Sequence, residues 1–110
     1  MARPVKCRKV CMMPENIEFK PCNENNCTVV LKVEEFEAIR LIDYEGLTQE
    51  ECALQMEIAR TTVQNIYDSA RKKIADIIVN GKILKIDGGN FEICNGAKKC
   101  NENNCPFKKI

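Results

Sequence analysis

Hydrophobic residues in the middle of the chain recur with a helical period. The apolar positions between Val33 and Glu45 fit a first helix, and Gly46 supplies its C-terminal stop. A short second helix begins after Thr48, whose side chain can cap it, while Glu51 can reach back to the free backbone amide. This helix is expected to end near residues 56–57. The pattern therefore predicts two helices joined by a tight turn.

A third helix has the clearest hydrophobic pattern in the sequence. It is expected from about Arg60 to Val79, a length of about 30 Å at about 1.5 Å per residue. Asn80 and Gly81 then supply the stop. The apolar residues recur at helical spacing and comprise Val63, Ile66, Tyr67, Ala70, Ile74, Ile77 and Ile78. Such a stripe predicts one buried face and one polar face.

The two ends of the chain lack this period. Residues 1–27 hold three of the four prolines and four of the eight cysteines, which predicts an irregular arm leading to a short strand over residues 28–31. Residues 82–86 and 90–93 flank Asp87-Gly-Gly89. Since Asp-Gly and Gly-Gly tolerate the positive φ of tight turns, this segment predicts a β-hairpin. Beyond it the tail is polar and contains further cysteines.

Charge is distributed unevenly along the helical segments. Residues 32–58 carry two basic and eight acidic residues, whereas residues 59–85 carry six basic and two acidic residues. An acidic segment followed at once by a basic one is typical of a helix pair with one face toward phosphate. A charged face that is merely solvated would give the same counts, so both readings stay open at this point.

The second and third helices together have the organisation of a helix-turn-helix. Arg60 can contact guanine or phosphate, and Gln64 and Asn65 can pair with the adenine edge, all from the turns that would enter a major groove. The predicted partner is double-stranded DNA, and an ordinary amphipathic helix pair is the alternative. The candidate DNA-binding residues are Thr48, Gln49, Arg60, Thr61, Thr62, Gln64, Asn65, Arg71 and Lys72.

These residues carry a resemblance to known DNA-binding families. The segment Thr48-Gln-Glu-Glu-Cys-Ala-Leu-Gln-Met-Glu-Ile-Ala-Arg-Thr-Thr-Val-Gln-Asn-Ile66 resembles the helix-turn-helix of region 4 of bacterial sigma factors. As far as about Gly89, the chain resembles an uncharacterised prokaryotic family of small predicted DNA-binding proteins. The similar segments are Met1-Ala-Arg-Pro4, Phe19-Lys-Pro21, Glu37-Ala-Ile-Arg-Leu41, Asp43-Tyr-Glu-Gly-Leu47, Ala70-Arg-Lys-Lys-Ile-Ala-Asp76, Gly81-Lys82 and Asp87-Gly-Gly89. The resemblance implies a sigma-region-4-like fold and DNA binding, and it names no target.

Two residues depart from the pattern of that family at the turn. Glu57 stands where the family usually has glycine, and a left-handed conformation there would cost a non-glycine residue about 1–2 kcal/mol. Ala59 stands where the family usually has serine or threonine, which removes an N-cap worth about 1 kcal/mol. The turn and the start of the third helix are therefore expected to be less well stabilised.

Eight cysteines without a histidine are the other unusual feature of the sequence. Cys22-Asn-Glu-Asn-Asn-Cys27 and Cys100-Asn-Glu-Asn-Asn-Cys105 are the same hexapeptide, one near each end. Two such loops supply four thiolates, the ligand set of a structural zinc ion and the usual ligand count of an iron–sulfur cluster. Cys7, Cys11 and Cys94 are further candidate ligands, and Cys52 is expected to be a buried apolar residue. Thiol redox chemistry and unliganded cysteines are the alternatives.

The expected fold class is mainly α, a three-helix helix-turn-helix core with a small C-terminal β-hairpin and irregular cysteine-rich ends. Its parts are a cysteine-containing arm (1–31), a helix-turn-helix domain (32–81), and the hairpin with its tail (82–110). The predicted function is sequence-specific DNA binding by a cytoplasmic transcriptional regulator responsive to metal or redox state. A homodimer is one of the expected assemblies. A metal or iron–sulfur carrier that uses its helices for protein contact is the alternative. Without histidine, and with acidic residues expected on solvated faces, we predict no enzyme.

Overall fold

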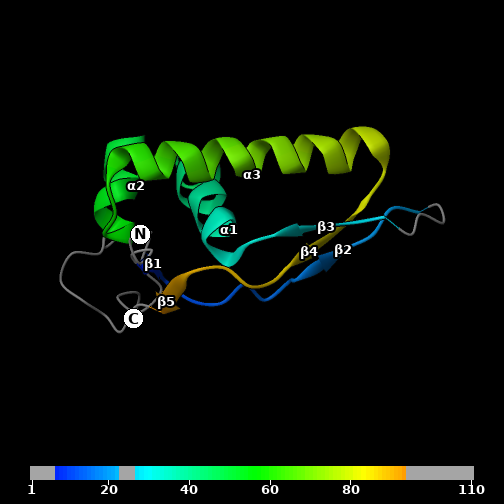
Figure 1. Ribbon diagram of the computed structural model, residues 1–110, viewed down its shortest axis with the longest axis horizontal. Coiled ribbons are helices and arrows are strands. Elements are labelled where there is room, and N and C mark those ends of the chain that lie inside the picture. The colour runs from blue at the N-terminus through cyan, green and yellow to red at the C-terminus, as the bar shows by residue number, and fades with distance from the viewer. Residues whose placement is uncertain (1–6, 23–26, 94–110) are drawn as a thin grey trace, which may run out of the picture.

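The computed structural model describes residues 7–22 and 27–93, which form a mixed α/β arrangement of helices over two small sheets (Figure 1). The expected mainly α class is therefore too narrow, because short strands from both ends of the chain pair beneath the helices. The described elements are β1 (Arg8–Val10), β2 (Glu18–Phe19), β3 (Thr28–Leu31), α1 (Val33–Ile39), η1 (Arg40–Tyr44), α2 (Gln49–Met56), α3 (Arg60–Asn80), β4 (Ile83–Ile86) and β5 (Phe91–Ile93). None of the described helices is both long and apolar enough to cross a membrane.

The three helical segments lie where the hydrophobic period places them. α1 continues directly into η1, a π-helical turn, and Gly46 follows with a positive φ of 84°. Thr48 and Glu51 form the predicted capping box at the start of α2. α3 ends at Gly81, which adopts the left-handed conformation (φ 64°) that glycine favours at a helix C-terminus. Local sequence therefore fixed these boundaries.

The strands pair across the whole chain. In one sheet β1 pairs in parallel with β5, and in the other β4 lies between β2, which is antiparallel to it, and β3, which is parallel. Parallel neighbours need a crossover connection, and the entire helical segment serves as the crossover between β3 and β4. The helices are thus anchored at both ends on one sheet. The segment predicted as an irregular arm (1–27) supplies β1 and β2, and β3 is the short strand predicted over residues 28–31.

The predicted hairpin at residues 82–93 is wrong, because β4 and β5 pair with other strands. Gly88 and Gly89 between them both have positive φ, and Gly89 also approaches α1 closely. The Val33 amide donates to the Gly88 carbonyl at 3.1 Å, and the Asn90 amide donates to a Glu34 carboxylate oxygen at 2.7 Å. Gly89, at φ 108°, lies against the Glu34 side chain, so that a Cβ there would overlap the carboxylate. The chain therefore passes under α1 and does not fold back on itself.

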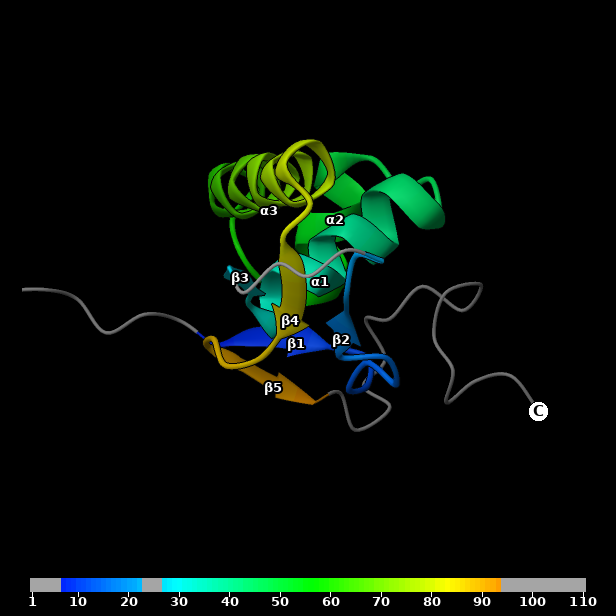
Figure 2. The same ribbon diagram turned by 90° about the vertical axis from the view of Figure 1, so that its right-hand side faces the viewer.

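Among the described residues, the buried apolar side chains form two clusters. One lies between η1, α2 and the start of α3 and contains Leu41, Leu47, Cys52, Ala53, Met56 and Val63. The other joins the strands to α1 and the middle of α3 and contains Val10, Leu31, Val33, Ala70 and Ile86. Figure 2, which looks along α3, shows that helix above α1 with the strands beneath. Ile78, predicted on the inner stripe, lies outside both clusters and is 73% exposed.

The acidic residues of α1 are buried, contrary to the expectation of solvated faces. Glu34, Glu35 and Glu37 each hold a different part of the chain. Glu34 accepts from the loop before β5, and Glu35 accepts from Ser69 (2.6 Å) and Lys73 (2.7 Å) on α3. Burial alone would raise the pKa of Glu35, but the hydrogen bonds from Lys73 and Ser69 outweigh it and lower the pKa. α1 is therefore the element that connects the helices to the strands.

Candidate nucleic-acid interface

The turn between α2 and α3 has the length of a helix-turn-helix turn, residues 57–59. Glu57 adopts the left-handed conformation expected there, with φ 58° and ψ 46°. The Ile58 amide donates to the Ala53 carbonyl at 3.1 Å and closes the turn. Ala59 occupies the N-cap position of α3 with extended backbone and no side-chain cap. Both departures noted in the sequence are therefore present at the positions where they should weaken the turn.

Apolar packing fixes α2 against α3 below this turn. Cys52, Met56 and Val63 are fully buried together, and the Cys52 thiol lies 3.7 Å from the Met56 sulfur. Burial raises the pKa of Cys52 to about 12, so its thiol stays protonated at neutral pH. Cys52 is therefore the buried apolar residue that the sequence predicted.

The first two turns of α3 present polar side chains to solvent. Arg60, Thr61, Gln64 and Asn65 are exposed, whereas Thr62 is half-buried. Within residues 7–22 and 27–93, these four exposed side chains make no hydrogen bond or ion pair. Because the inner face of the same turns is anchored by Val63, their backbone is held while their polar groups stay available.

Two further candidates lie at the start of α2, and one of them, Thr48, already forms hydrogen bonds within the protein. The Thr48 hydroxyl accepts the Glu51 amide hydrogen at 3.1 Å, and the Glu51 carboxylate accepts the Thr48 amide hydrogen at 2.9 Å. Gln49 is half-buried, and its side-chain oxygen is buried with no hydrogen-bond partner in the described part of the chain. Thr48 is therefore first a helix cap, and any contact with DNA would be additional.

Arg71 belongs to a small network that the sequence did not reveal. Its guanidinium donates to the Tyr67 hydroxyl at 2.7 Å and lies over the Tyr67 ring, 5.4 Å from the centroid. Tyr67 donates in turn to Asp43 at 2.7 Å, and this hydrogen bond raises the pKa of Tyr67. Arg71 is thus oriented by η1, while Lys72 beside it is exposed. The helical spacing of Tyr67 and Arg71 was the only signal available in the sequence.

Glu37 of α1 forms a buried ion pair with Arg40 and also binds Cys11, the residue that follows β1. Glu37 is 1% exposed and accepts from the Nε (2.9 Å) and Nη2 (3.0 Å) of Arg40 and from the Cys11 amide (3.1 Å). The Gln55 amide of α2 donates to the Cys11 sulfur at 3.4 Å. Burial, with the charge of Glu37 next in importance, raises the pKa of Cys11 to about 11. At neutral pH the Cys11 thiol therefore keeps its proton, as the Cys52 thiol does.

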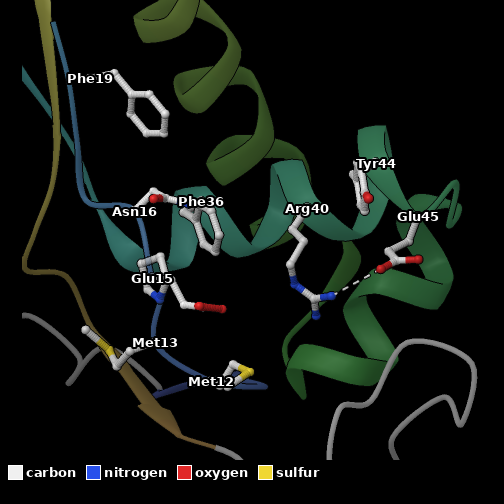
Figure 3. Close-up of a pocket in the computed structure, with 10 residues that line it drawn as sticks. Met12, Met13, Glu15, Asn16, Phe19, Phe36, Arg40, Tyr44 and Glu45 are labelled. Atoms are coloured by element: carbon white, nitrogen blue, oxygen red, sulfur yellow. Dashed lines mark hydrogen bonds and ion pairs between the residues drawn. The ribbon is translucent and has the colours of Figure 1, made fainter. Parts of the chain in front are cut away.

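Arg40 also borders a groove of about 500 Å³ between the β1–β2 connection and α1–η1. Figure 3 shows Phe19 and Phe36 above this groove, with Met12 and Met13 at its lower side and the Arg40–Glu45 contact at its far end. None of the lining residues belongs to α3. The groove is therefore separate from the polar surface of the candidate interface.

The cysteine ligand set cannot be assembled from the described residues alone. Cys7, Cys22 and Cys27 are exposed, and Cys11 is buried. Among residues 7–22 and 27–93, no group of three or more cysteine, aspartate or glutamate side chains could hold a metal ion. The remaining predicted ligands, Cys94, Cys100 and Cys105, lie outside the described residues. The zinc or iron–sulfur site stays a prediction.

Comparison with known proteins places the chain in a family. It matches the family described as "Protein of unknown function DUF134" over residues 1–94. A "UPF0251 protein" of Desulfitobacterium hafniense (strain DSM 10664 / DCB-2) is 54% identical over 99 residues, covering 87% of this chain and 79% of the relative. A second "UPF0251 protein", of Caldicellulosiruptor bescii, is 51% identical over 100 residues, which cover 91% of this chain and 71% of that relative. No solved structure matches the chain significantly. The chain belongs to the DUF134/UPF0251 family of bacterial proteins.

Proposed function

We propose that this protein is a sequence-specific DNA-binding protein, a transcriptional regulator that reads the major groove with the first two turns of α3. The observation that carries the proposal is the exposed polar set at the start of α3. Arg60, Gln64 and Asn65 project from turns whose inner face is fixed by Val63, and they make no hydrogen bond or ion pair with the described remainder of the chain. Side chains of this kind on a recognition helix pair with base edges.

Each of these side chains has a defined partner in a major groove. A guanidinium such as that of Arg60 can donate two hydrogen bonds to guanine, and an amide such as that of Gln64 or Asn65 can donate to and accept from adenine. Each well-placed pair of this kind discriminates against the wrong base by about 1–3 kcal/mol. Two or three such pairs would give the protein its sequence preference.

Basic residues further along α3 would supply affinity without sequence preference. Lys72 is exposed, and Arg71 is held by Tyr67 and Asp43 with its side chain still largely open to solvent. Because the Arg71 side chain is already oriented, it can contact a phosphate while losing little conformational freedom. Affinity should therefore fall as salt rises, because each neutralised phosphate releases bound counterions.

The test is selection of duplex DNA by the purified full-length protein. Random-sequence duplexes are bound, washed at moderate salt and sequenced, and the recovered motif is then bound at several salt concentrations. We expect an enriched motif and an affinity that falls steeply with salt. Failure of folded protein to enrich any motif, or an affinity independent of salt, would overturn the proposal.

A pair of matched variants connects the motif to α3. Asn65→Ala removes an exposed amide from the reading face, and Asn16→Ala removes an exposed amide from the β1–β2 connection. Asn65→Ala should weaken binding to the motif by about 1–3 kcal/mol and relax the preference at one base position. Asn16→Ala should bind as the unchanged protein does. Equal binding by both variants would exclude Asn65 from the reading surface.

A further inference from the structure

The groove beside Arg40 has the size and the lining of a site for a small organic molecule. Its volume of about 500 Å³ lies within the range of about 300–1,000 Å³ that is typical of such sites. Met12, Met13 and Phe19 line it and are exposed, and Phe36 of α1 lies between Phe19 and the two methionines (Figure 3). Single exposed apolar residues are common on protein surfaces, whereas several that line one groove indicate a contact surface.

The charged side chains at the groove have a negative balance. The buried Glu37 accepts two hydrogen bonds from Arg40 and so compensates the charge of the guanidinium. Glu45 contacts Arg40 through one carboxylate oxygen, at 3.4 Å. Glu15 is exposed and forms no ion pair within residues 7–22 and 27–93, and in Figure 3 its carboxylate points into the groove. Three carboxylates therefore accompany one guanidinium, which leaves an excess of two negative charges.

The uncharged part of the lining suits a large cation better than a small one. Phe36 and Tyr44 both border the groove, and the faces of aromatic rings attract cations. The thioethers of Met12 and Met13 are polarizable and adapt to ligands of different shapes. A metal ion would have to lose bound water to contact such groups, whereas an organic cation with an apolar body loses little. An anion would be repelled by the excess of carboxylates.

We infer that this groove binds a small lipophilic cation, a positively charged onium or amine group carried on an aromatic or aliphatic body. The apolar body contacts the methionine and phenylalanine side chains, and the positive charge lies toward Glu15 and Glu45. The inference is independent of the proposed function, since none of the lining residues belongs to α3. Direct binding therefore tests it without DNA.

The first experiment compares two ions of nearly the same size and shape and of opposite charge, tetraphenylphosphonium and tetraphenylborate. Each is titrated into the purified full-length protein in a sodium buffer of low ionic strength and followed by calorimetry. We expect the phosphonium to bind at least about tenfold more tightly than the borate, because the carboxylates attract one ion and repel the other. Equal binding of the two ions, or tighter binding of the borate, would overturn the inference.

Substitutions at exposed positions then locate the bound cation. Glu15→Gln should weaken phosphonium binding by about two- to fivefold, and Glu50→Gln on the exposed surface of α2 should leave it unchanged. Tyr44→Ser removes a ring that is 82% exposed and should weaken binding by a similar factor of about two to five, with Leu54→Ser, at a 71% exposed position, as its control. Circular dichroism confirms that each variant is folded. Controls that lose as much affinity as the groove variants would place the cation elsewhere and overturn the inference.

A double variant separates the effect of charge from that of apolar contact. Glu15→Gln/Glu45→Gln keeps the apolar lining, so the preference for phosphonium over borate should largely disappear while both ions still bind. A preference that persists in this variant would contradict the inference. Sedimentation equilibrium of the full chain tests the other occupant, a second copy. A dimer that binds the phosphonium only after it dissociates would make the second copy the occupant and would also overturn the inference.

Discussion

The buried ion pair of Glu37 and Arg40 makes a sharp prediction about stability. Glu37→Gln keeps the size of the side chain but removes its charge and turns one acceptor oxygen into a donor. The carboxylate now accepts two hydrogen bonds from Arg40 and one from the Cys11 amide. After the substitution one of these donors faces another donor inside the protein, and the charge of Arg40 loses its main partner.

The size of the effect follows from the burial of this pair. Breaking a buried ion pair from one side costs about 3–5 kcal/mol. The Glu37 side chain is almost fully buried and that of Arg40 about four-fifths buried, so screening by water reduces the cost only in part. We expect Glu37→Gln to lower the free energy of unfolding by about 3 kcal/mol. Native domains typically have a free energy of unfolding of about 5–15 kcal/mol, so this loss is a large share of the total.

Urea unfolding followed by circular dichroism at 222 nm measures this change by linear extrapolation. Glu50→Gln on the exposed surface of α2 is the matched control and should lie within about 0.5 kcal/mol of the unchanged protein. A loss below about 1 kcal/mol for Glu37→Gln, close to the control, would show that the ion pair does not brace the helices. The double variant Glu37→Gln/Arg40→Met should recover part of the loss, because the unpaired charge is then removed.

Three further predictions concern the turn and the acidic residues of α1. Glu57→Gly should raise the free energy of unfolding by about 0.5–1 kcal/mol, since glycine avoids the left-handed strain while losing more chain entropy; thermal unfolding that shows no gain would contradict it. Ala59→Ser should add about 1 kcal/mol by capping α3, with Ala75→Ser as the control within the helix. The pKa of Glu35 lies below its ordinary value of 4.5, so its stabilisation is complete above about that pH and is lost as pH falls through the folded-state pKa. The stability difference between the unchanged protein and Glu35→Gln should therefore shrink below pH 4.5 or so, and a constant difference would refute this.

The sequence by itself determined the helices, their caps and the exposed polar face at the start of α3. Thr48, Gly46 and Gly81 act through hydrogen bonds and dihedral angles within a few residues. A short stretch of sequence is therefore enough to predict where each helix begins or ends. The exposure of Arg60 and Asn65 likewise follows from the helical period. Sequence motifs also sufficed to indicate the family, because family membership is recognised from the order of residues and requires no knowledge of their contacts.

The tertiary structure alone decided which strands pair and which polar groups are buried. Asp87-Gly-Gly89 looks like a hairpin turn, but the partner of each strand is set by segments more than fifty residues away, and Gly89 makes a close contact with Glu34. Glu37 on α1 gave no sign of burial, since its partners are Arg40 one turn on and an amide of β1's neighbour Cys11. A sequence states which groups are polar, and only the folded chain can bring their partners to them.

The same reason explains the apolar end of α3. Periodicity assigns Ile78 to the hydrophobic side of a helix, but burial also requires another element on that side. The clusters that cover the middle of α3 do not reach its last turns, so Ile78 and Val79 stay in solvent. The local sequence therefore determined the helix and its polar face, whereas the packing of distant segments decided which part of its apolar surface stayed exposed.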